Sequence, residues 1–175
     1  AEDPDSDEAL EFALALQETL SEEAGLTLFC GIGDPAGSVE GLRESCAQAQ
    51  AAMDIGPRYL PKESVFSWHK LLMPRFLNEI PAERAGYYHG LLFNPHTAPL
   101  FTEEMLDTVT MFLQKDLNMS DTARQLYIHR NTLVYRLDKI QRIIGLDLRA
   151  FDDAVTFKMM MLLGKNANDR GRLYA

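Results

Sequence analysis

The chain has 175 residues, of which 46% are hydrophobic and 25% charged, and its formal net charge is −9. This composition is ordinary for a globular protein, and the length suits one large domain or two small ones. No apolar run is long enough to span a bilayer, no signal peptide opens the chain, and Cys30 and Cys46 lack the spacing of a zinc or redox site. We therefore expect a cytoplasmic protein with buried, reduced thiols and without cofactor or metal.

The first part of the chain, residues 1–68, is predicted to be a small α/β lobe. The run LTLFCG is apolar and bounded by Gly, as in a buried strand, and SVFSW is a second strand candidate. The glycine-rich GIGDPAGS between the helices has neither the GK[ST] ending of a phosphate loop nor the G-x-G-x-x-G fingerprint of a dinucleotide site. The predicted elements are a disordered lead 1–6, a helix 7–24, a strand 26–31, a helix 39–53 and a strand 64–68.

The rest of the chain is predicted to be helical. A helical connector occupies 69–100, a helical domain 101–166 and a flexible tail 167–175. Two of the predicted helices flank residues 120–144, and the apolar stripe on each of them predicts the core of the helical domain. The whole chain is thus α+β and mostly helical. The helices are predicted over 71–80, 83–92, 103–116 and 152–164, with core stripes Leu106, Val109, Phe112, Leu113 and Phe151, Val155, Met159, Leu162, Leu163.

Residues 120–144 have the pattern of two short helices joined by a tight turn, a helix-turn-helix. Ser120 is the predicted N-cap of the first helix, and Ala123 is small where the two helices cross closely. Position 127 often carries Gly in such motifs but is Tyr127 here. The small core beneath the turn is predicted to be Leu126, Ile128 and Leu133.

The second helix, about residues 130–143, has two chemically different faces. Leu133, Leu137, Ile140 and Ile144 recur with helical period, so that amides, hydroxyls and cations fall on the opposite side. These groups contact phosphates and base edges, which makes this helix the candidate recognition helix for a DNA major groove. The candidate DNA-binding residues are Ser120, Thr122, Arg124, His129, Arg130, Asn131, Thr132, Tyr135, Arg136, Lys139 and Arg142.

Charge is distributed unevenly along the chain. Residues 120–149 hold six Lys or Arg and three Asp or Glu, whereas residues 1–23 hold nine acids and no base. A basic patch on an acidic body favours oriented docking on DNA over indiscriminate binding, because non-specific affinity comes from summed phosphate contacts.

The run YIHRNTLVYRLDKIQRIIGLDLRAFDD resembles the C-terminal helix-turn-helix of PucR/CdaR-type bacterial transcriptional regulators, through HRNTL-x-YRL and the following GLDL. The resemblance implies a Fis-like recognition helix in which Arg130 and Thr132 approach the bases. The order of elements before it looks like the C-terminal half of the degenerate GGDEF-like domain of these regulators. The resemblance further implies a C-terminal fragment of a homodimeric, sequence-specific regulator of double-stranded DNA, whose effector-binding region lies upstream.

Two other functions are compatible with a chain of this length and composition. A cyclase-like enzyme would need paired metal-binding carboxylates, but no GG[DE]EF string occurs and Asp34 is the only acid close to the glycine loop. Asp152 and Asp153 lie at a helix start, where capping explains them. A protein-interaction module would present an apolar outward face on the second helix, whereas this face is cationic and rich in amides. We therefore predict a protein that is not an enzyme.

Overall fold

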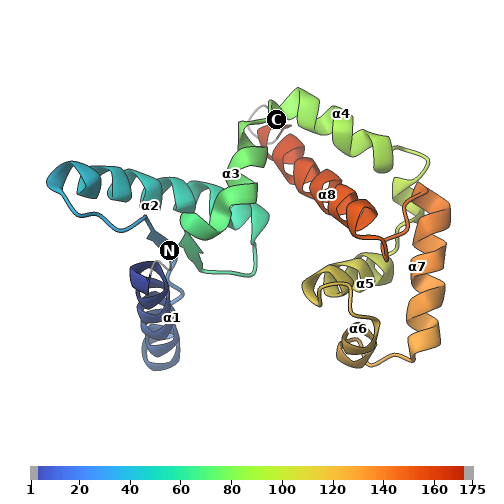
Figure 1. The fold of residues 1–175 in the computed structure, drawn as a ribbon, viewed down its shortest axis with the longest axis horizontal. Helices are drawn as coiled ribbons and strands as arrows, with labels where there is room; N and C mark the ends of the chain where they lie inside the picture. The colour runs from blue at the N-terminus through green and yellow to red at the C-terminus, as the bar shows by residue number, and fades with distance from the viewer. Residues whose placement is uncertain (1–3, 172–175) are drawn as a thin grey trace. The chain divides into compact units, whose positions relative to one another are not determined.

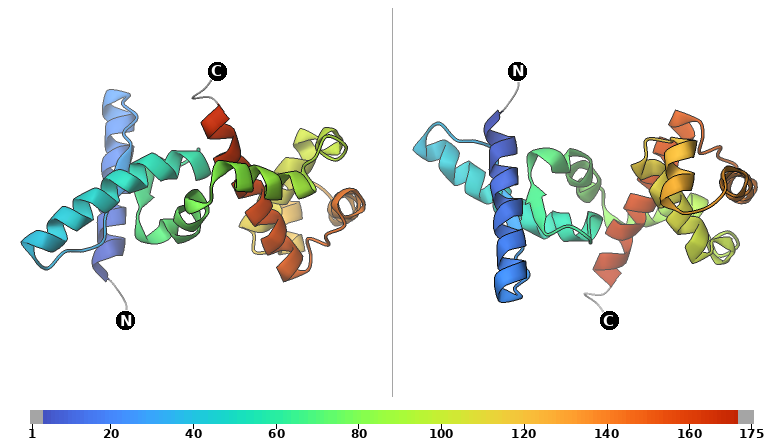
Figure 2. Two further views of the ribbon diagram at one scale, coloured as in Figure 1. Left: turned by 90° about the horizontal axis from the view of Figure 1, so that it is seen from above. Right: turned by 90° about the horizontal axis from the view of Figure 1, so that it is seen from below.

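The structure is a computed structural model that describes residues 4–171, with side chains for residues 8–167. It divides into two compact units, residues 1–81 and 82–175. The elements follow one another along the chain as Figures 1 and 2 show. They are α1 (Pro4–Ala24), β1 (Cys30–Ile32), α2 (Val39–Tyr59), β2 (Val65–Ser67), η1 (His69–Leu71), α3 (Leu72–Glu79), α4 (Ala82–Leu92), η2 (Ala98–Leu100), α5 (Glu103–Gln114), α6 (Met119–Gln125), α7 (Arg130–Ile144) and α8 (Phe151–Gly171).

The first unit is built on a two-stranded parallel sheet. Strands β1 and β2 pair in register Cys30–Val65, Gly31–Phe66 and Ile32–Ser67, with α2 as the crossover between them. Parallel strands require such a long connection, and a helix is its usual form. The predicted fold class, α+β and mostly helical, is confirmed.

The first two glycines of the GIGDPAGS run, Gly31 and Gly33, serve packing in this unit. A Cβ on Gly31 would lie 2.1 Å from the Ala49 carbonyl oxygen, and one on Gly33 would lie 2.0 Å from the Ser45 carbonyl oxygen. Only glycine lets β1 and the segment after it approach the backbone of α2 this closely. The glycine run thus brings a helix onto a strand.

Helix α2 is longer than the predicted 39–53. Its N-cap is Ser38, whose hydroxyl accepts a hydrogen bond from the Gly41 N–H at 3.1 Å. The helix continues to Tyr59 because Ala52, Gly56 and Tyr59 stay buried at helical spacing, and Gly56 lies against the Phe66 ring of β2. Continued burial against the sheet therefore extends the helix through Pro57.

Three other predictions for this unit were wrong. The strand predicted over 26–31 forms only over Cys30–Ile32. Helix α1 begins at Pro4, so residues 4–6 are helical and not a disordered lead. Proline is favoured in the first helical turn, where its missing N–H costs nothing. Residues 1–3 lie outside the described residues. Cys46 is exposed and Cys30 half-buried, so the predicted burial of both thiols does not occur.

The second unit buries one core beneath the helix-turn-helix. Its buried members are Met105, Val109, Phe112, Ala123, Leu133, Leu137, Ile140, Leu148 and Phe157. Of the predicted stripe of α5, Val109 and Phe112 belong to this core and Leu113 packs against it, whereas Leu106 is 37% exposed. The predicted stripe of α8 lies outside this core, and Phe151 is 72% exposed. Met105 of α5 and Phe157 of α8 are buried in this core.

Helix α8 packs along α4, and the two remain side by side in Figures 1 and 2. It reaches Gly171, so residues 167–171 are helical where a tail was predicted, and 172–175 lie outside the described residues. The helix is extended because it has α4 to pack on. None of the helices in the described part of the chain combines the length and the apolar character that a membrane crossing requires.

Candidate nucleic-acid interface

The first helix of the motif, α6, is capped by Asn118 and not by Ser120. The Asn118 side chain accepts hydrogen bonds from the backbone N–H groups of Ser120 and Asp121, at 3.0 and 3.1 Å. Asn is as good an N-cap as Ser, and here its backbone is extended while the helix has begun by Met119. The prediction placed the cap two residues too late. Ser120 is exposed in the first turn and remains available to a ligand.

Thr122 is the candidate contact that the structure removes from the surface. Its side chain is fully buried, and its hydroxyl donates a hydrogen bond to the Asn118 carbonyl oxygen at 2.7 Å. It faces inward because it lies beside Ala123 on the side of α6 that packs on the core. Arg124, by contrast, is exposed and pairs with Asp121 at 2.5 Å.

The turn between α6 and α7 explains why Gly is common at its second position. Tyr127 has a φ of 55°, in the left-handed region that glycine enters without penalty. The Tyr127 N–H donates to the Arg124 carbonyl oxygen at 3.2 Å, and the Ile128 N–H to that of Ala123 at 3.0 Å. These two bonds satisfy carbonyl groups at the end of α6 and reverse the chain toward α7.

Helix α7 begins and ends with well-defined caps. His129 is the N-cap, and its Nδ1 accepts a hydrogen bond from the Asn131 N–H at 3.2 Å. With Nδ1 as the acceptor, the ring proton is on Nε2, and His129 is exposed. At the other end Gly145 has a φ of 78° and donates its N–H to the Gln141 carbonyl oxygen at 2.8 Å. The helix therefore spans residues 130–144, close to the predicted 130–143.

The two faces of α7 divide as its periodicity predicts. Leu133, Leu137 and Ile140 are at most 1% exposed. The opposite side carries amide, hydroxyl, phenol and cationic groups in contact with solvent, and Tyr135 is 61% exposed. One anchored face and one free polar face are what a helix needs to enter a groove of DNA. The exposed candidates on this helix are Arg130, Asn131, Thr132, Tyr135, Lys139 and Arg142.

Arg136 does not join this exposed set. Its side chain is only 16% exposed and points toward α5, where it donates a hydrogen bond to the Thr108 hydroxyl at 3.0 Å and pairs with Glu104. Thr108 is fully buried, and its hydroxyl donates a hydrogen bond to the Glu104 carbonyl oxygen at 2.7 Å. Arg136 thus fastens the candidate recognition helix to α5, a role that the sequence did not reveal.

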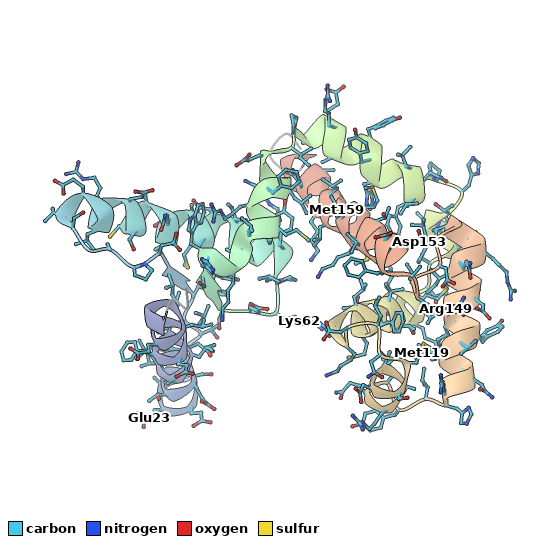
Figure 3. All side chains as sticks on the ribbon, in the orientation of Figure 1. Glu23, Lys62, Met119, Arg149, Asp153 and Met159 are labelled. Atoms are coloured by element: carbon cyan, nitrogen blue, oxygen red, sulfur yellow. The ribbon has the colours of Figure 1, made fainter. Side chains whose placement is uncertain are left out.

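The GLDL segment after α7 is held by Arg149, which Figure 3 labels beside that helix. Its guanidinium donates to the carboxylates of Asp147 and Asp138, at 2.6 and 2.8 Å, and to the Gln141 side chain at 2.9 Å. The hydrogen bond from Arg149 lowers the pKa of the Asp147 carboxyl group. Asp153, at the start of α8, accepts from the Asp147 N–H at 2.8 Å. These bonds fix the path of the chain from α7 into α8, whose Phe157 lies in the same core as the buried face of α7.

The described residues hold no group of three His, Cys, Asp or Glu side chains arranged to bind a metal ion. The exposed face of α7 offers hydrogen-bonding groups and positive charge, both suited to a nucleic acid.

Comparison with known proteins agrees with this geometry. Residues 105–163 match the family model of the PucR C-terminal helix-turn-helix domain, and residues 1–55 match that of the GGDEF-like domain. Both resemblances predicted from the sequence are thereby confirmed.

Three curated relatives are regulators by name. The purine catabolism regulatory protein of Bacillus subtilis is 25% identical over 157 residues, which are 88% of this chain and 29% of that protein. The carbohydrate diacid regulator of Escherichia coli is 26% identical over 129 residues, 70% of this chain and 32% of that protein. The DNA-binding transcriptional activator AdeR of Bacillus subtilis is 26% identical over 151 residues, 83% of this chain and 36% of that protein. The chain spans about a third of the length of these relatives.

Proposed function

The chain belongs to the PucR family of helix-turn-helix regulators, and on that premise we propose that it binds double-stranded DNA sequence-specifically and regulates transcription. The observation that carries the proposal is the division of α7 into a fully buried apolar face and an exposed polar, cationic face. In the proposed complex α7 lies in the major groove with its first turn nearest the bases.

The exposed candidates take different roles in this complex. Arg130, Asn131 and Thr132 lie in the first turn of α7 and are proposed to meet base edges, where Arg pairs with guanine and Asn with adenine. Lys139 and Arg142 lie further along the helix and are proposed to neutralise phosphates. The remaining proposed contacts, placed around this face, are Ser120, Arg124, His129 and Tyr135.

We further propose that the complete regulator acts as a homodimer in the cytoplasm. One recognition helix covers only a few base pairs, and two copies on two half-sites supply the missing specificity. Because the chain spans about a third of the length of its relatives, we infer that the effector is sensed in another part of a longer protein. The GGDEF-like part is proposed to be structural and not an enzyme, since it lacks the GG[DE]EF signature.

The proposal is tested by selecting duplexes that the full chain retains from a random library. The affinity for the selected duplex and for a scrambled duplex is then measured by fluorescence anisotropy at two salt concentrations. We expect tighter binding to the selected sequence and a linear fall of log K with log salt for both. Equal affinity for the two duplexes would contradict sequence-specific recognition, and no binding to either would contradict DNA binding altogether.

A further inference from the structure

Tyr127 combines two features that do not explain each other. Its φ of 55° is a backbone conformation that glycine adopts freely and that an aromatic residue adopts at a cost. Its side chain is 94% exposed, the largest exposed fraction among the exposed large hydrophobic residues of the described chain. Favourable packing of the side chain can offset the conformational free energy of a strained backbone, but the Tyr127 ring lies in solvent.

Within the described residues Tyr127 has no compensating partner. Its hydroxyl group forms no hydrogen bond and its ring stacks on no other ring, whereas Tyr87 and Tyr88 on α4 pair with each other at 5.4 Å. Strained residues retained without an internal benefit point to a function outside the folded chain. The contact that compensates for the strained backbone of Tyr127 is therefore expected to be with another molecule.

The position of Tyr127 in the motif identifies the contact. It precedes Arg130, the first residue of α7, by three positions, so their Cα atoms lie within about 10 Å of each other. The major groove that would receive the start of α7 is about 12 Å wide and is bordered by the two phosphate strands. A side chain that projects from the turn just before the helix therefore meets the border of the groove and not the bases at its floor.

We propose that the Tyr127 hydroxyl donates a hydrogen bond to a phosphate oxygen of the DNA strand beside the recognition helix, and so sets how α7 enters the groove. This inference rests on the proposed DNA binding. Contacts of this kind fix the register of a protein on the duplex without reading its sequence. A tyrosine gives the contact without charge, which separates it from the lysine and arginine contacts of α7.

The test uses two substitutions in the full chain. Tyr127→Phe removes only the hydroxyl group, and we expect a loss of affinity of about two- to tenfold, the range of one hydrogen bond. The loss should be equal on selected and scrambled duplexes, and the salt slope should not change, because no counterion is released by a neutral donor. Tyr127→Gly relieves the backbone, so we expect a higher melting temperature together with weaker DNA binding. Tyr87→Phe on α4, also exposed, is the matched control and should bind as the wild type does.

The outcomes separate this inference from the proposed function. Wild-type affinity in Tyr127→Phe and Tyr127→Gly would overturn the phosphate contact while leaving DNA binding intact, and would direct attention to a protein partner. A loss confined to the selected duplex would overturn it in favour of a base contact. Failure of the wild-type chain to bind any duplex would instead refute the proposed function, before any variant is compared.

Discussion

The Arg136 guanidinium on the candidate recognition helix donates a hydrogen bond to the Thr108 hydroxyl on α5, over 3.0 Å and across 28 residues of sequence. Thr108 is fully buried and Arg136 nearly so, while Glu104, the ionic partner of Arg136, is mostly exposed. An exposed carboxylate contributes little to such a pair, so the bond to Thr108 is the part that holds α7 against α5.

This relationship predicts a coupled effect on stability. Arg136→Ala and Thr108→Val should each lower the free energy of unfolding by about 1–2 kcal/mol, because each breaks the same partly buried hydrogen bond. The double variant should lose less than the sum of the two, which a double-mutant cycle in urea measures. Additive losses would show that the two side chains act independently. The salt dependence of DNA binding is measured as well. If its slope is flatter by about one unit in Arg136→Ala but not in Thr108→Val, Arg136 contacts a DNA phosphate.

The packing of α8 on α4 gives a second prediction. A Cβ on Gly164 would lie 2.5 Å from Nδ1 and Cε1 of His89. The His89 ring cannot retreat, because it stacks on Phe93 at 4.8 Å and its Nδ1 donates to the Met160 carbonyl oxygen at 2.9 Å. Gly164→Ala should therefore destabilise the chain by about 1–3 kcal/mol, as overpacking does, in thermal or urea unfolding.

Gly86 on α4 is the matched control for this substitution. A Cβ there would make only an ordinary contact with Ala167, at 3.6 Å, inside a regular helix. Gly86→Ala should raise stability by about 0.5–1 kcal/mol through helix propensity. If both substitutions stabilise the chain, the tight fit of α8 on His89 is refuted.

The sequence predicted the site where local pattern decides the structure. The helical period of Leu133, Leu137 and Ile140 correctly predicted the buried face of α7. Asn118 and Ser120 are both good capping residues two positions apart, so propensity could not choose between them.

The features of the fold and of the site that the sequence did not predict depend on contacts between residues distant in sequence. Arg136 lies at the edge of the polar face of α7, and only its partners on α5 turn it inward. Phe151 fits the apolar period of α8 but lies in its first turn, where it stays 72% exposed. Helices α2 and α8 exceed their predicted ends because β2 and α4 offer surfaces on which they continue to pack. The periodicity of apolar residues predicts which face of a helix is buried, but the end of the helix depends on how far the neighbouring element extends beside it.

The Asp147–Arg149 bond predicts a dependence of stability on pH. Arg149 lowers the pKa of Asp147 in the folded chain, so the stabilisation is complete above about pH 4, the usual carboxyl pKa, and is lost as the pH falls through the lower folded value. Asp147→Asn should be less stable than the wild type at pH 7, and the two should converge in strong acid. Urea midpoints across this range measure it. Asp107→Asn, at an exposed position of α5, controls for the lost charge, and a constant gap at every pH would contradict the prediction.

The GGDEF-like part should be catalytically silent. Residues 1–68 contain no GG[DE]EF string and no pair of carboxylates beside the glycine loop, and we therefore predict that this part does not bind a magnesium–nucleotide complex productively. After incubation with GTP and Mg²⁺, chromatography should recover the nucleotide unchanged. A cyclic dinucleotide whose formation follows the protein through successive purification steps would refute this expectation.

The last prediction separates base reading from phosphate binding on α7. Arg130 lies at the start of the helix, where a bidentate contact with guanine is worth about 1–3 kcal/mol of discrimination. Arg130→Ala should therefore weaken binding to the selected duplex far more than to a scrambled one. Lys139 lies more than two turns along, where the helix leaves the centre of the groove; Lys139→Ala should weaken both duplexes alike and flatten the salt slope by about one unit. Anisotropy titrations of both variants on both duplexes decide the matter, and equal losses for Arg130→Ala on the two sequences would make Arg130 a phosphate contact.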